Sequence, residues 1–336
     1  MCCFGLLMTV RINQVKIYKL FEFDNNRFDI NKHLPLFLTD ICINKIKGNM
    51  ENKVWYITGA SKGLGLSLVK KLLQAGHKVA ATSRTISALK AVIGDVAADL
   101  FLPLEVDLCN DGSISTSIQK TVETFGKIDV VVNNAGYGIG GSVEELSENE
   151  VVDCFNVNVF AAVNVIKHVL PVMRAQQSGH IINIASIAGF APTTGWSLYA
   201  GTKFALIGIS EVLAEDVKEF GIKVTVAAPG AFRTEFLTGQ SLVLAKNQIV
   251  DYKAIRESQE RMLTMDGKQA GDPDKAADIF IQLAEMDEPP VRLFMGTDAY
   301  KRASQKIEAL AIDLEKWKEL SFATDYKQQP NVLNLQ

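Results

Sequence analysis

The stretch Thr58-Gly59-Ala60-Ser61-Lys62-Gly63-Leu64-Gly65 joins a short apolar run to a longer amphipathic one, and this junction decides the fold. Residues 53–58 before it are typical of a strand, and the helical pattern of residues 63–75 follows. Glycines let the backbone approach a pyrophosphate, and the free N–H groups of a helix N-terminus attract its charge. A P-loop would end in Gly-Lys-Ser or Gly-Lys-Thr, which this loop lacks. The sequence therefore predicts a dinucleotide-binding turn.

The second strand ends in Thr82-Ser83-Arg84 and carries no acidic residue at that end. NAD-binding folds usually place Asp or Glu about 20 residues past the glycines, where it binds the ribose 2′-hydroxyl. Arg84 lies 19 residues after Gly65, and a guanidinium there suits a 2′-phosphate through paired, charge-assisted hydrogen bonds. Lys62 adds a second charge, although a solvated loop lysine and a surface arginine at a helix start are the structural alternatives. Together the two residues favour NADP over NAD.

Short apolar runs alternate with longer amphipathic stretches from Met50 onward. The expected strands are residues 53–58, 78–82, 100–104, 128–132, 179–184, 222–227 and 291–295. The expected helices are residues 63–75, 85–93, 111–125, 147–174, 198–219 and 272–286. Nearly continuous apolar runs are typical of parallel strands covered on both faces. The alternation predicts an α/β fold, a doubly wound (Rossmann) three-layer sandwich whose central parallel seven-stranded sheet has the order 3-2-1-4-5-6-7.

Three segments differ in character along the chain. Residues 1–49 show no sustained helical or strand period, so we expect an N-terminal extension that is not part of the fold. A misplaced start codon and a genuine targeting or regulatory extension are alternative origins for it. Residues 50–300 contain no repeat or low-complexity linker and form one expected domain, with a substrate lid near 232–268. Residues 301–336 are expected to form a C-terminal helix and a frayed tail.

Composition narrows the function classes. The 336 residues are 48% hydrophobic and 22% charged, with a formal net charge of −3, which is ordinary for a globular protein and gives no support for nucleic-acid binding. No run approaches the roughly 20 apolar residues that span a bilayer, so no membrane span is expected. An odd number of irregularly spaced cysteines argues against disulfides and a metal site, and favours free thiols in the cytoplasm. These are Cys2, Cys3, Cys42, Cys109 and Cys154.

Tyr199-Ala200-Gly201-Thr202-Lys203 places a tyrosine and a lysine four residues apart, and therefore on one face of a helix. An unperturbed tyrosine has a pKa of about 10 and is a poor base at neutral pH. A neighbouring ammonium favours the phenolate and lowers that pKa, so that the pair works as a general acid and base. The Tyr-x-x-x-Lys spacing alone is common by chance. Its position after a strand that ends in Ala185-Ser186 makes it a more specific sign of a catalytic pair.

Five motifs in this order resemble the short-chain dehydrogenases/reductases of the classical type, over roughly residues 52–300. They are Thr58-Gly59…Gly63…Gly65, the turn Asn133-Asn134-Ala135-Gly136, Asn158 within residues 155–160, Ser186 placed 13 residues before Tyr199, and Pro229-Gly230…Thr234. Two small departures are Thr202, where the family often has Ser, and Ala185 before the serine. Neither departure removes a reacting group.

The resemblance implies roles for four catalytic residues. Tyr199 exchanges a proton with the carbonyl or alcohol oxygen, and Ser186 hydrogen-bonds that oxygen, so these two are also the expected substrate contacts. Lys203 lowers the pKa of the tyrosine and holds the nicotinamide ribose. Asn158 holds a water in a proton relay, with Asn156 as the fallback if the register is wrong.

The resemblance also implies the cofactor contacts. Thr234 is expected at the carboxamide, and Asn134 and Gly136 on the adenosine side. Asp107 is expected near the adenine, with a strand-end cap as the alternative. The full expected set is Gly59, Ser61, Lys62, Gly63, Leu64, Gly65, Ser83, Arg84, Asp107, Asn134, Ala135, Gly136, Tyr199, Lys203, Pro229, Gly230 and Thr234.

Loops beyond the carboxyl ends of the strands should contact the substrate. Their bulky side chains predict an apolar pocket or, alternatively, ordinary packing beneath a lid. These side chains are Tyr137, Phe190, Trp196, Phe232, Phe236, Leu237, Leu242 and Leu244. We expect an NADP-dependent oxidoreductase that interconverts a secondary alcohol and a carbonyl on an apolar small-molecule substrate, and no sequence feature distinguishes a steroid, a fatty ketone or a small aldehyde.

Two other functions were compared with this one. An extended-type epimerase or dehydratase resembles the chain in Tyr-x-x-x-Lys, but usually has a Gly-x-x-Gly-x-x-Gly loop and a larger C-terminal domain. An NADP-binding regulator or redox sensor without turnover predicts a broken tetrad, whereas all four members are present. Family members often pair the helices that correspond to residues 147–174 and 198–219, so the resemblance implies a homodimer or homotetramer.

Overall fold

The computed structural model describes residues 7–12, 15–20, 52–239 and 241–326. By its internal contacts the chain forms two compact units, Met1–Glu51 and Asn52–Gln336. Nothing in these units tests where the native protein starts, so a start at Met50 stays a prediction.

The first unit contains an antiparallel hairpin that the sequence did not predict. β1 (Leu7–Ile12) pairs with β2 (Val15–Leu20) along their whole length. The absence of a sustained hydrophobic period in residues 1–49 therefore did not indicate these two strands. A strand pair is stabilised across its ladder, so the periodicity of one short segment is weak evidence about pairing.

The second unit is built around a sheet of seven strands in which all neighbours are parallel. The strands are β3 (Val54–Ile57), β4 (Lys78–Ser83), β5 (Phe101–Glu105), β6 (Val130–Asn133), β8 (Gly179–Ile184), β9 (Ile222–Pro229) and β11 (Arg292–Met295). They run β5-β4-β3-β6-β8-β9-β11 across the sheet, which is the order 3-2-1-4-5-6-7 along the chain. The predicted fold and strand order are confirmed, and the strand ends differ from prediction by at most two residues.

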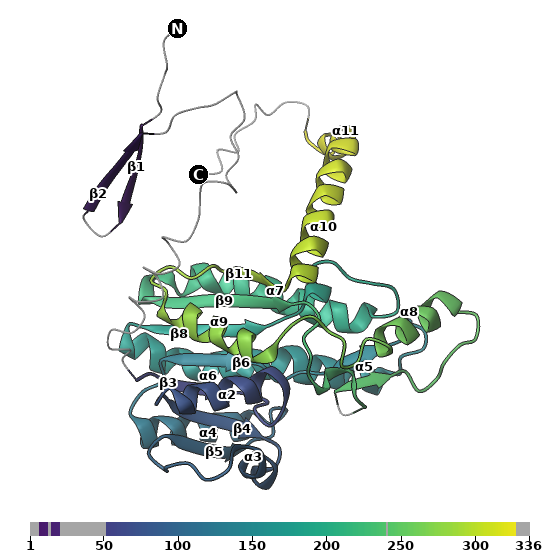
Figure 1. Cartoon of the computed structure of the whole chain (residues 1–336). Helices are drawn as coiled ribbons and strands as arrows, with labels where there is room; N and C mark the ends of the chain where they lie inside the picture. Colours follow the sequence, from purple (N-terminus) through teal and green to yellow (C-terminus); the bar gives the residue numbers. More distant parts are fainter. Residues whose placement is uncertain (1–6, 13–14, 21–51, 240, 327–336) are drawn as a thin grey trace. The chain divides into compact units, whose positions relative to one another are not determined.

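Helices cover both faces of this sheet (Figure 1). The helices of the described residues are α2 (Gly63–Gln74), α3 (Ile86–Ile93), α4 (Asp111–Phe125), α5 (Glu148–Phe155), α6 (Ala161–Gln176), α7 (Ser197–Asp216), α8 (Lys253–Leu263), α9 (Pro273–Glu285), α10 (Thr297–Lys316) and α11 (Lys318–Phe322). α10 and α11 extend away from the sheet (Figure 1). Short turns of other helical types are η2 (Asn156–Phe160), η3 (Ile187–Gly189), η4 (Lys218–Phe220) and η5 (Glu235–Leu237).

Two buried clusters, one on each face of the sheet, form the core. On one face, Leu72 of α2 and Phe280 of α9 pack against Trp55 of β3. On the other face, Val165 of α6 packs in the cluster of Tyr56. Trp55 and Tyr56 are successive residues that point to opposite faces, and both are fully buried. This double burial is why the strands are almost continuously apolar.

The predicted helix 147–174 is interrupted in the structure. A capping box between Ser147 and Glu150 starts α5, but the π-turn η2 separates α5 from α6. A π-turn is a local bulge within a helix that is frequent at functional sites. The helical pattern expected over residues 147–174 is confirmed as one helical stretch, Glu148–Gln176. The π-turn within it could not be predicted, because a single bulge hardly alters the hydrophobic period.

The segment predicted as a substrate lid, residues 232–268, has regular structure. It contains η5, the short strand β10 (Leu242–Leu244) and α8. β10 pairs in parallel with β7 (Gly138–Gly140), which follows the turn after β6. The segment is therefore hydrogen-bonded to the loop that starts at the end of a central strand.

A buried carboxylate holds this segment in place. Glu145 is 1% exposed and accepts hydrogen bonds from the N–H groups of Ser142 at 2.8 Å and Ile249 at 2.7 Å. Its other partner is the guanidinium of Arg256 on α8. Burial raises the pKa of Glu145, but these hydrogen bonds and the Arg256 charge outweigh burial, so the net pKa lies below the ordinary value. The carboxylate is thus kept charged, which favours the contacts that join the loop to α8.

Candidate active site

The glycine loop makes a close contact with the turn after β6. A side chain at Gly59 would bring its Cβ within 2.8 Å of Ala135 Cα, and one at Gly65 within 2.5 Å of Asn134 Nδ2. Gly59 also has a φ of +64°, in the left-handed region that favours glycine. The backbone can lie this close to its neighbours because these positions lack a Cβ, and α2 starts at once behind the loop.

Hydrogen bonds fasten the same contact. Thr58 Oγ1 accepts from the backbone N–H groups of Asn134 and Ala135, both at 3.0 Å. The side-chain amide of Asn134 returns two bonds, to the carbonyl oxygens of Thr58 and Gly59, both at 2.9 Å. Asn134 therefore holds the loop with its side chain. The other predicted cofactor residues of these segments are Ser61, Leu64, Ser83 and Gly136.

Positive charge gathers beside the loop. Burial lowers the pKa of Lys62, the nearby Arg84 guanidinium lowers it further, and Glu235 opposes the change. Lys62 and Arg84 come from different strand ends, yet they are close enough to interact electrostatically. Asp107 acts at the next strand end, where its carboxylate accepts from Cys109 N at 2.9 Å. This bond is the turn-capping contact that the sequence analysis kept as the alternative for Asp107.

Tyr199 and Lys203 lie one turn apart on α7 and are both buried. The Lys203 ammonium lies 5.9 Å from the centre of the Tyr199 ring and donates to the Ile184 carbonyl at 2.9 Å. The hydroxyl of Ser186, which follows β8, hydrogen-bonds the Tyr199 side chain. The structure therefore brings the predicted serine, tyrosine and lysine together.

Burial controls the acidity of this pair. It raises the pKa of Tyr199 to about 12; the Ser186 hydrogen bond opposes this rise and the Cys154 thiol adds to it. Burial also lowers the pKa of Lys203 to about 8, which Cys154 partly opposes. Burial is the largest cause of the Tyr199 shift, because it removes the phenol from water and so disfavours the phenolate. The expected lowering of this pKa by Lys203 stays a prediction.

The π-turn η2 carries Asn158 into the site. Its amide donates to the carbonyl of Tyr137 at 2.9 Å and to Thr202 Oγ1 at 3.1 Å, and its Oδ1 accepts from Tyr137 N at 2.9 Å. A Cβ on Gly136 would lie 3.1 Å from Asn158 Oδ1 and 3.4 Å from Lys203 Nζ. The side chains of Asn158 and Lys203 thus both lie against Gly136. Asn158, rather than the fallback Asn156, makes these contacts.

Thr202 is a residue that the sequence analysis noted only as a departure from the family. Its hydroxyl donates to the Tyr199 carbonyl at 2.7 Å and accepts from Asn158. It therefore links the helix of the tyrosine to the π-turn. The position of Thr202 directly before Lys203 in the Tyr-x-x-x-Lys motif is the feature of the sequence that could have indicated this role.

The segment after β9 lies against the glycine loop. A Cβ on Gly63 would be 3.7 Å from Thr234 Cβ. Asp298, at the start of α10, accepts from Ala231 N at 2.8 Å and would lie 2.2 Å from a Cβ on Gly230. Asp298 cannot be recognised from the sequence pattern, because its partner Ala231 lies 67 residues earlier in the chain.

Apolar side chains border Tyr199, but only some of the predicted ones do so. The rings of Tyr199 and Phe236 are 5.9 Å apart, and Tyr137 packs in the same cluster. Phe190 instead packs on Phe294 of β11, with ring centres 5.1 Å apart. Phe232 packs against the core cluster of the sheet. The apolar border is therefore narrower than the sequence suggested.

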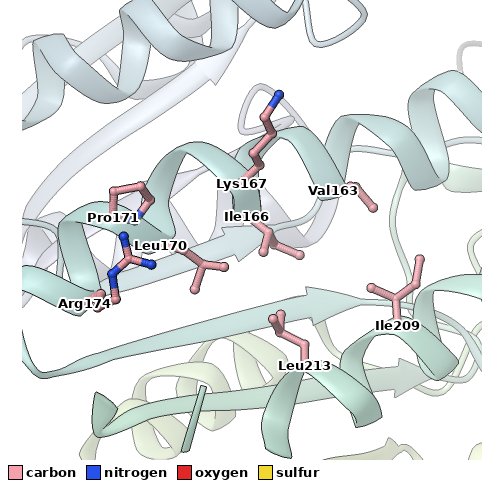
Figure 2. A pocket seen from close by; sticks show the side chains of 8 residues that line it. All are labelled: Val163, Ile166, Lys167, Leu170, Pro171, Arg174, Ile209 and Leu213. Atoms are coloured by element: carbon pink, nitrogen blue, oxygen red, sulfur yellow. The ribbon is translucent and has the colours of Figure 1, made fainter. Parts of the chain in front are cut away.

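A separate apolar groove of about 410 Å³ lies between α6 and α7, away from Tyr199 (Figure 2). Its lining residues are Val163, Ile166, Lys167, Leu170, Pro171, Arg174, Ile209 and Leu213. Within the described residues, one helical stretch, Glu148–Gln176, is long and apolar enough to span a membrane by length and composition, a test that core helices also pass. The absence of a membrane span stays a prediction.

No group of three or more metal-binding side chains occurs in the part of the chain that the structure describes. Two of the five predicted free thiols lie in that part, Cys109 exposed and Cys154 buried, and both are free. Cys2, Cys3 and Cys42 lie outside the described residues.

Comparisons with known proteins agree on one family. A family model described as short chain dehydrogenase matches residues 53–242. The chain is 35% identical over 272 residues to the oxidoreductase BOA17 of Botryotinia fuckeliana, which covers 81% of this chain and 99% of that protein. It is also 35% identical over 247 residues to a 3-ketodihydrosphingosine reductase of Bacteroides thetaiotaomicron, which covers 74% of this chain and 89% of that protein.

Solved structures show the same similarity. A short-chain dehydrogenase from Streptomyces avermitilis superposes with a TM-score of 0.75 at 33% identity, covering 82% of this chain and all of that one. A metagenomic short-chain oxidoreductase in complex with NADP gives a TM-score of 0.56 at 26% identity, covering 72% of this chain and 96% of that one.

The buried lysine should make stability depend on pH. Burial lowers the pKa of Lys203 to about 8 in the folded protein, whereas an unfolded lysine titrates near about 10.4. Between these values the unfolded state binds more protons, so the free energy of unfolding rises with pH. The raised pKa of Tyr199 acts in the opposite direction only above its ordinary value, at about pH 10.

Urea unfolding of wild type and Lys203→Met across this pH window measures the effect. The wild type should gain stability relative to the variant as pH rises. Lys218→Met, at a side chain that is 78% exposed, should keep the wild-type slope. Parallel curves for wild type and Lys203→Met would show that the buried lysine does not titrate as stated.

Proposed function

The chain belongs to the short-chain dehydrogenase/reductase family, and from this premise we propose that it interconverts a secondary alcohol and its carbonyl compound with NADP. The observation that carries the proposal is the group formed by Ser186, Tyr199 and Lys203, with Asn158 beside it. The complete tetrad weighs against the alternative of a cofactor-binding regulator without turnover.

The residues of the loop fit a dinucleotide. Gly59 and Gly65 let the loop pack directly on the turn after β6, where a Cβ would clash, and the N-terminus of α2 provides free N–H groups for a pyrophosphate. Lys62 and Arg84 lie together at the neighbouring strand ends, where a 2′-phosphate would be held by charge-assisted bonds. When bound, the nicotinamide supplies the hydride for carbonyl reduction and accepts it in alcohol oxidation.

Tyr199 acts as the proton donor in the reducing direction. Its raised pKa keeps the hydroxyl protonated at neutral pH, so Oη gives its proton to the substrate oxygen as negative charge develops there. Ser186 Oγ, already bonded to Tyr199, donates to the same oxygen. The Lys203 ammonium then stabilises the phenolate, and Asn158 lies next to the lysine on the route by which the proton is replaced. The oxidation direction reverses these steps.

The substrate is proposed to be an alcohol or carbonyl compound whose body is apolar. Phe236 and Tyr137 pack with Tyr199, so the reacting group would approach along an apolar border. One relative is named as a reductase of a keto compound, 3-ketodihydrosphingosine, which is consistent with carbonyl reduction. The free thiols of Cys109 and Cys154 support a proposed cytoplasmic location.

We also propose a homodimer or homotetramer that uses the outer face of α6 and α7. Phe160 of η2, directly before α6, is 52% exposed, and Phe204 and Val212 of α7 are 44% and 63% exposed. The groove of Figure 2 runs between the same two helices. Exposed apolar residues beside an apolar groove are typical of an interaction surface.

Tyr199→Phe should abolish turnover and spare cofactor binding. Loss of a general acid lowers the rate by about 100- to 10,000-fold. NADPH absorbance is followed with a panel of ketones and aldehydes, and NADPH binding is titrated separately. Tyr326→Phe, at a side chain 89% exposed, should keep wild-type rates. Full activity of Tyr199→Phe would contradict the proposed proton donor, and tight NADPH binding without turnover on any substrate would favour the regulator.

Arg84→Gln should impair the use of NADPH and leave NADH unaffected. A charge-assisted hydrogen bond contributes about 1.5–3 kcal/mol, so KM for NADPH should rise by about 10- to 150-fold. Arg261→Gln, at a side chain 71% exposed, is the matched control. A wild type that prefers NADH would overturn the NADP assignment.

Val212→Glu should halve the molar mass measured by light scattering after size-exclusion chromatography, because it places a charge in the α6–α7 face. Val250→Glu, at a position 84% exposed in the lid segment, should leave the mass unchanged. A strictly monomeric wild type would exclude the proposed oligomer.

A further inference from the structure

The first turn of α10 lies against the segment that follows β9. The carboxylate of Asp298 accepts a hydrogen bond from Ala231 N at 2.8 Å. It also lies directly against Gly230: the three atoms nearest to a Cβ built there all belong to the Asp298 carboxyl group, well inside van der Waals contact. The φ of Gly230 lies outside the left-handed region, so glycine is needed at this position for space and not for backbone conformation. The backbone at Gly230 is therefore fitted to a carboxylate from a distant helix.

The rest of this segment is held at two further points. The carbonyl of Ala231 accepts from Gly271 N at 3.0 Å, and Arg233 N donates to Gly271 O at 2.8 Å. Thr234 lies against the glycine loop, where a Cβ on Gly63 would be 3.7 Å from Thr234 Cβ. Residues 231–234 thus connect the start of α10 to the loop of the proposed cofactor site.

The base of α10 is anchored in the domain, which fixes the position of the carboxylate. Ala299 and Ala303 are buried in a cluster with η3. The guanidinium of Arg302 donates to the carbonyl of Ala191, which follows η3. Burial lowers the pKa of Arg302, and the Asp298 carboxylate opposes this change, so the two charges attract each other across one turn of the helix. Asp298 is therefore held between the loop after β8 and the segment after β9.

We propose that Asp298 is a positioning residue for the nicotinamide half of the cofactor. This inference rests on the proposed function and on the expected contact of Thr234 with the carboxamide. Asp298 holds the N–H of Ala231 while Gly271 holds its carbonyl, so Thr234 is presented to the cofactor in one orientation. A segment that is already ordered before binding costs the cofactor less conformational entropy.

A purely helical role for Asp298 is the alternative, because an acidic residue in the first turn of a helix is stabilising by itself. Asp274 is the matched control, since it is the second residue of α9 as Asp298 is of α10. It is exposed and lies in a different helix from the contacts described above. A helical role alone predicts that neither residue distinguishes one part of the cofactor from another.

Binding titrations on the full-length protein separate these two roles. Asp298→Ala leaves Ala231 N–H without its acceptor, so Kd for NADPH should rise by about 5- to 150-fold. Adenosine 2′,5′-bisphosphate has the 2′-phosphate but no nicotinamide, and should bind the variant as it binds wild type. Asp298→Asn keeps an acceptor oxygen and should restore most of the NADPH affinity, and Asp274→Ala should bind both probes as wild type does.

Three outcomes of these titrations would overturn the positioning role: an unchanged Kd for NADPH in Asp298→Ala, equal weakening of both probes, or equal losses in Asp298→Asn and Asp298→Ala. The test needs no turnover. If wild type prefers NADH, the same comparison is made with NADH and adenosine monophosphate, so failure of the NADP assignment is seen in wild type and failure of this inference only in the variants.

A double-mutant cycle tests the direct contact with Gly230. Gly230→Ala in the wild-type background places a Cβ against the carboxylate and should weaken NADPH binding. In the Asp298→Ala background the same Cβ has room, so the second substitution should cost less affinity than it does in wild type. Urea unfolding of each variant without cofactor checks that the four proteins are folded. Strictly additive losses of NADPH affinity would show that Asp298 does not act through this segment.

Discussion

The contact between the glycine loop and the turn after β6 is the constraint on which the site depends. β3 and β6 are neighbours at the point where the strand order reverses, which is where doubly wound sheets bind ligands. Two backbone N–H groups converge on Thr58 Oγ1, and the amide of Asn134 returns to the loop. Because Gly59 and Gly65 have no Cβ, the two turns can meet. The N-terminus of α2 is thereby fixed beside the crevice.

Burial decides the chemistry of the catalytic pair. It raises the pKa of Tyr199 and lowers that of Lys203, so that the neutral form of each side chain is favoured. A protonated phenol suits the proposed donation of a proton to a carbonyl oxygen. Asn158 of the π-turn donates to the hydroxyl of Thr202, which in turn donates to the carbonyl of Tyr199 on α7. These two hydrogen bonds connect the π-turn to the helix that carries Tyr199 and Lys203. The buried contacts that shift the two pKa values therefore also hold the two side chains in place.

The surface proposed for assembly and the base of α10 both adjoin the elements that carry the site. α7 bears Tyr199 on its buried side and Val212 on its exposed side. The base of α10 packs on η3, directly after Ser186, and Asp298 holds the segment after β9.

The sequence by itself determined the sheet and its strand order, and it picked out the glycine loop and the four residues proposed as the tetrad. Those features depend on local pattern: apolar period, glycine spacing and the separation of Tyr199 from Lys203. Only the tertiary structure decided the raised pKa of Tyr199, the π-turn at Asn158, the role of Asp298 and the choice of Phe236 over Phe190 at the tyrosine. Each of these features arises from burial, from hydrogen bonds between residues that are distant in the chain, or from a local bulge in a helix. The hydrophobic period of the sequence carries no information about such contacts.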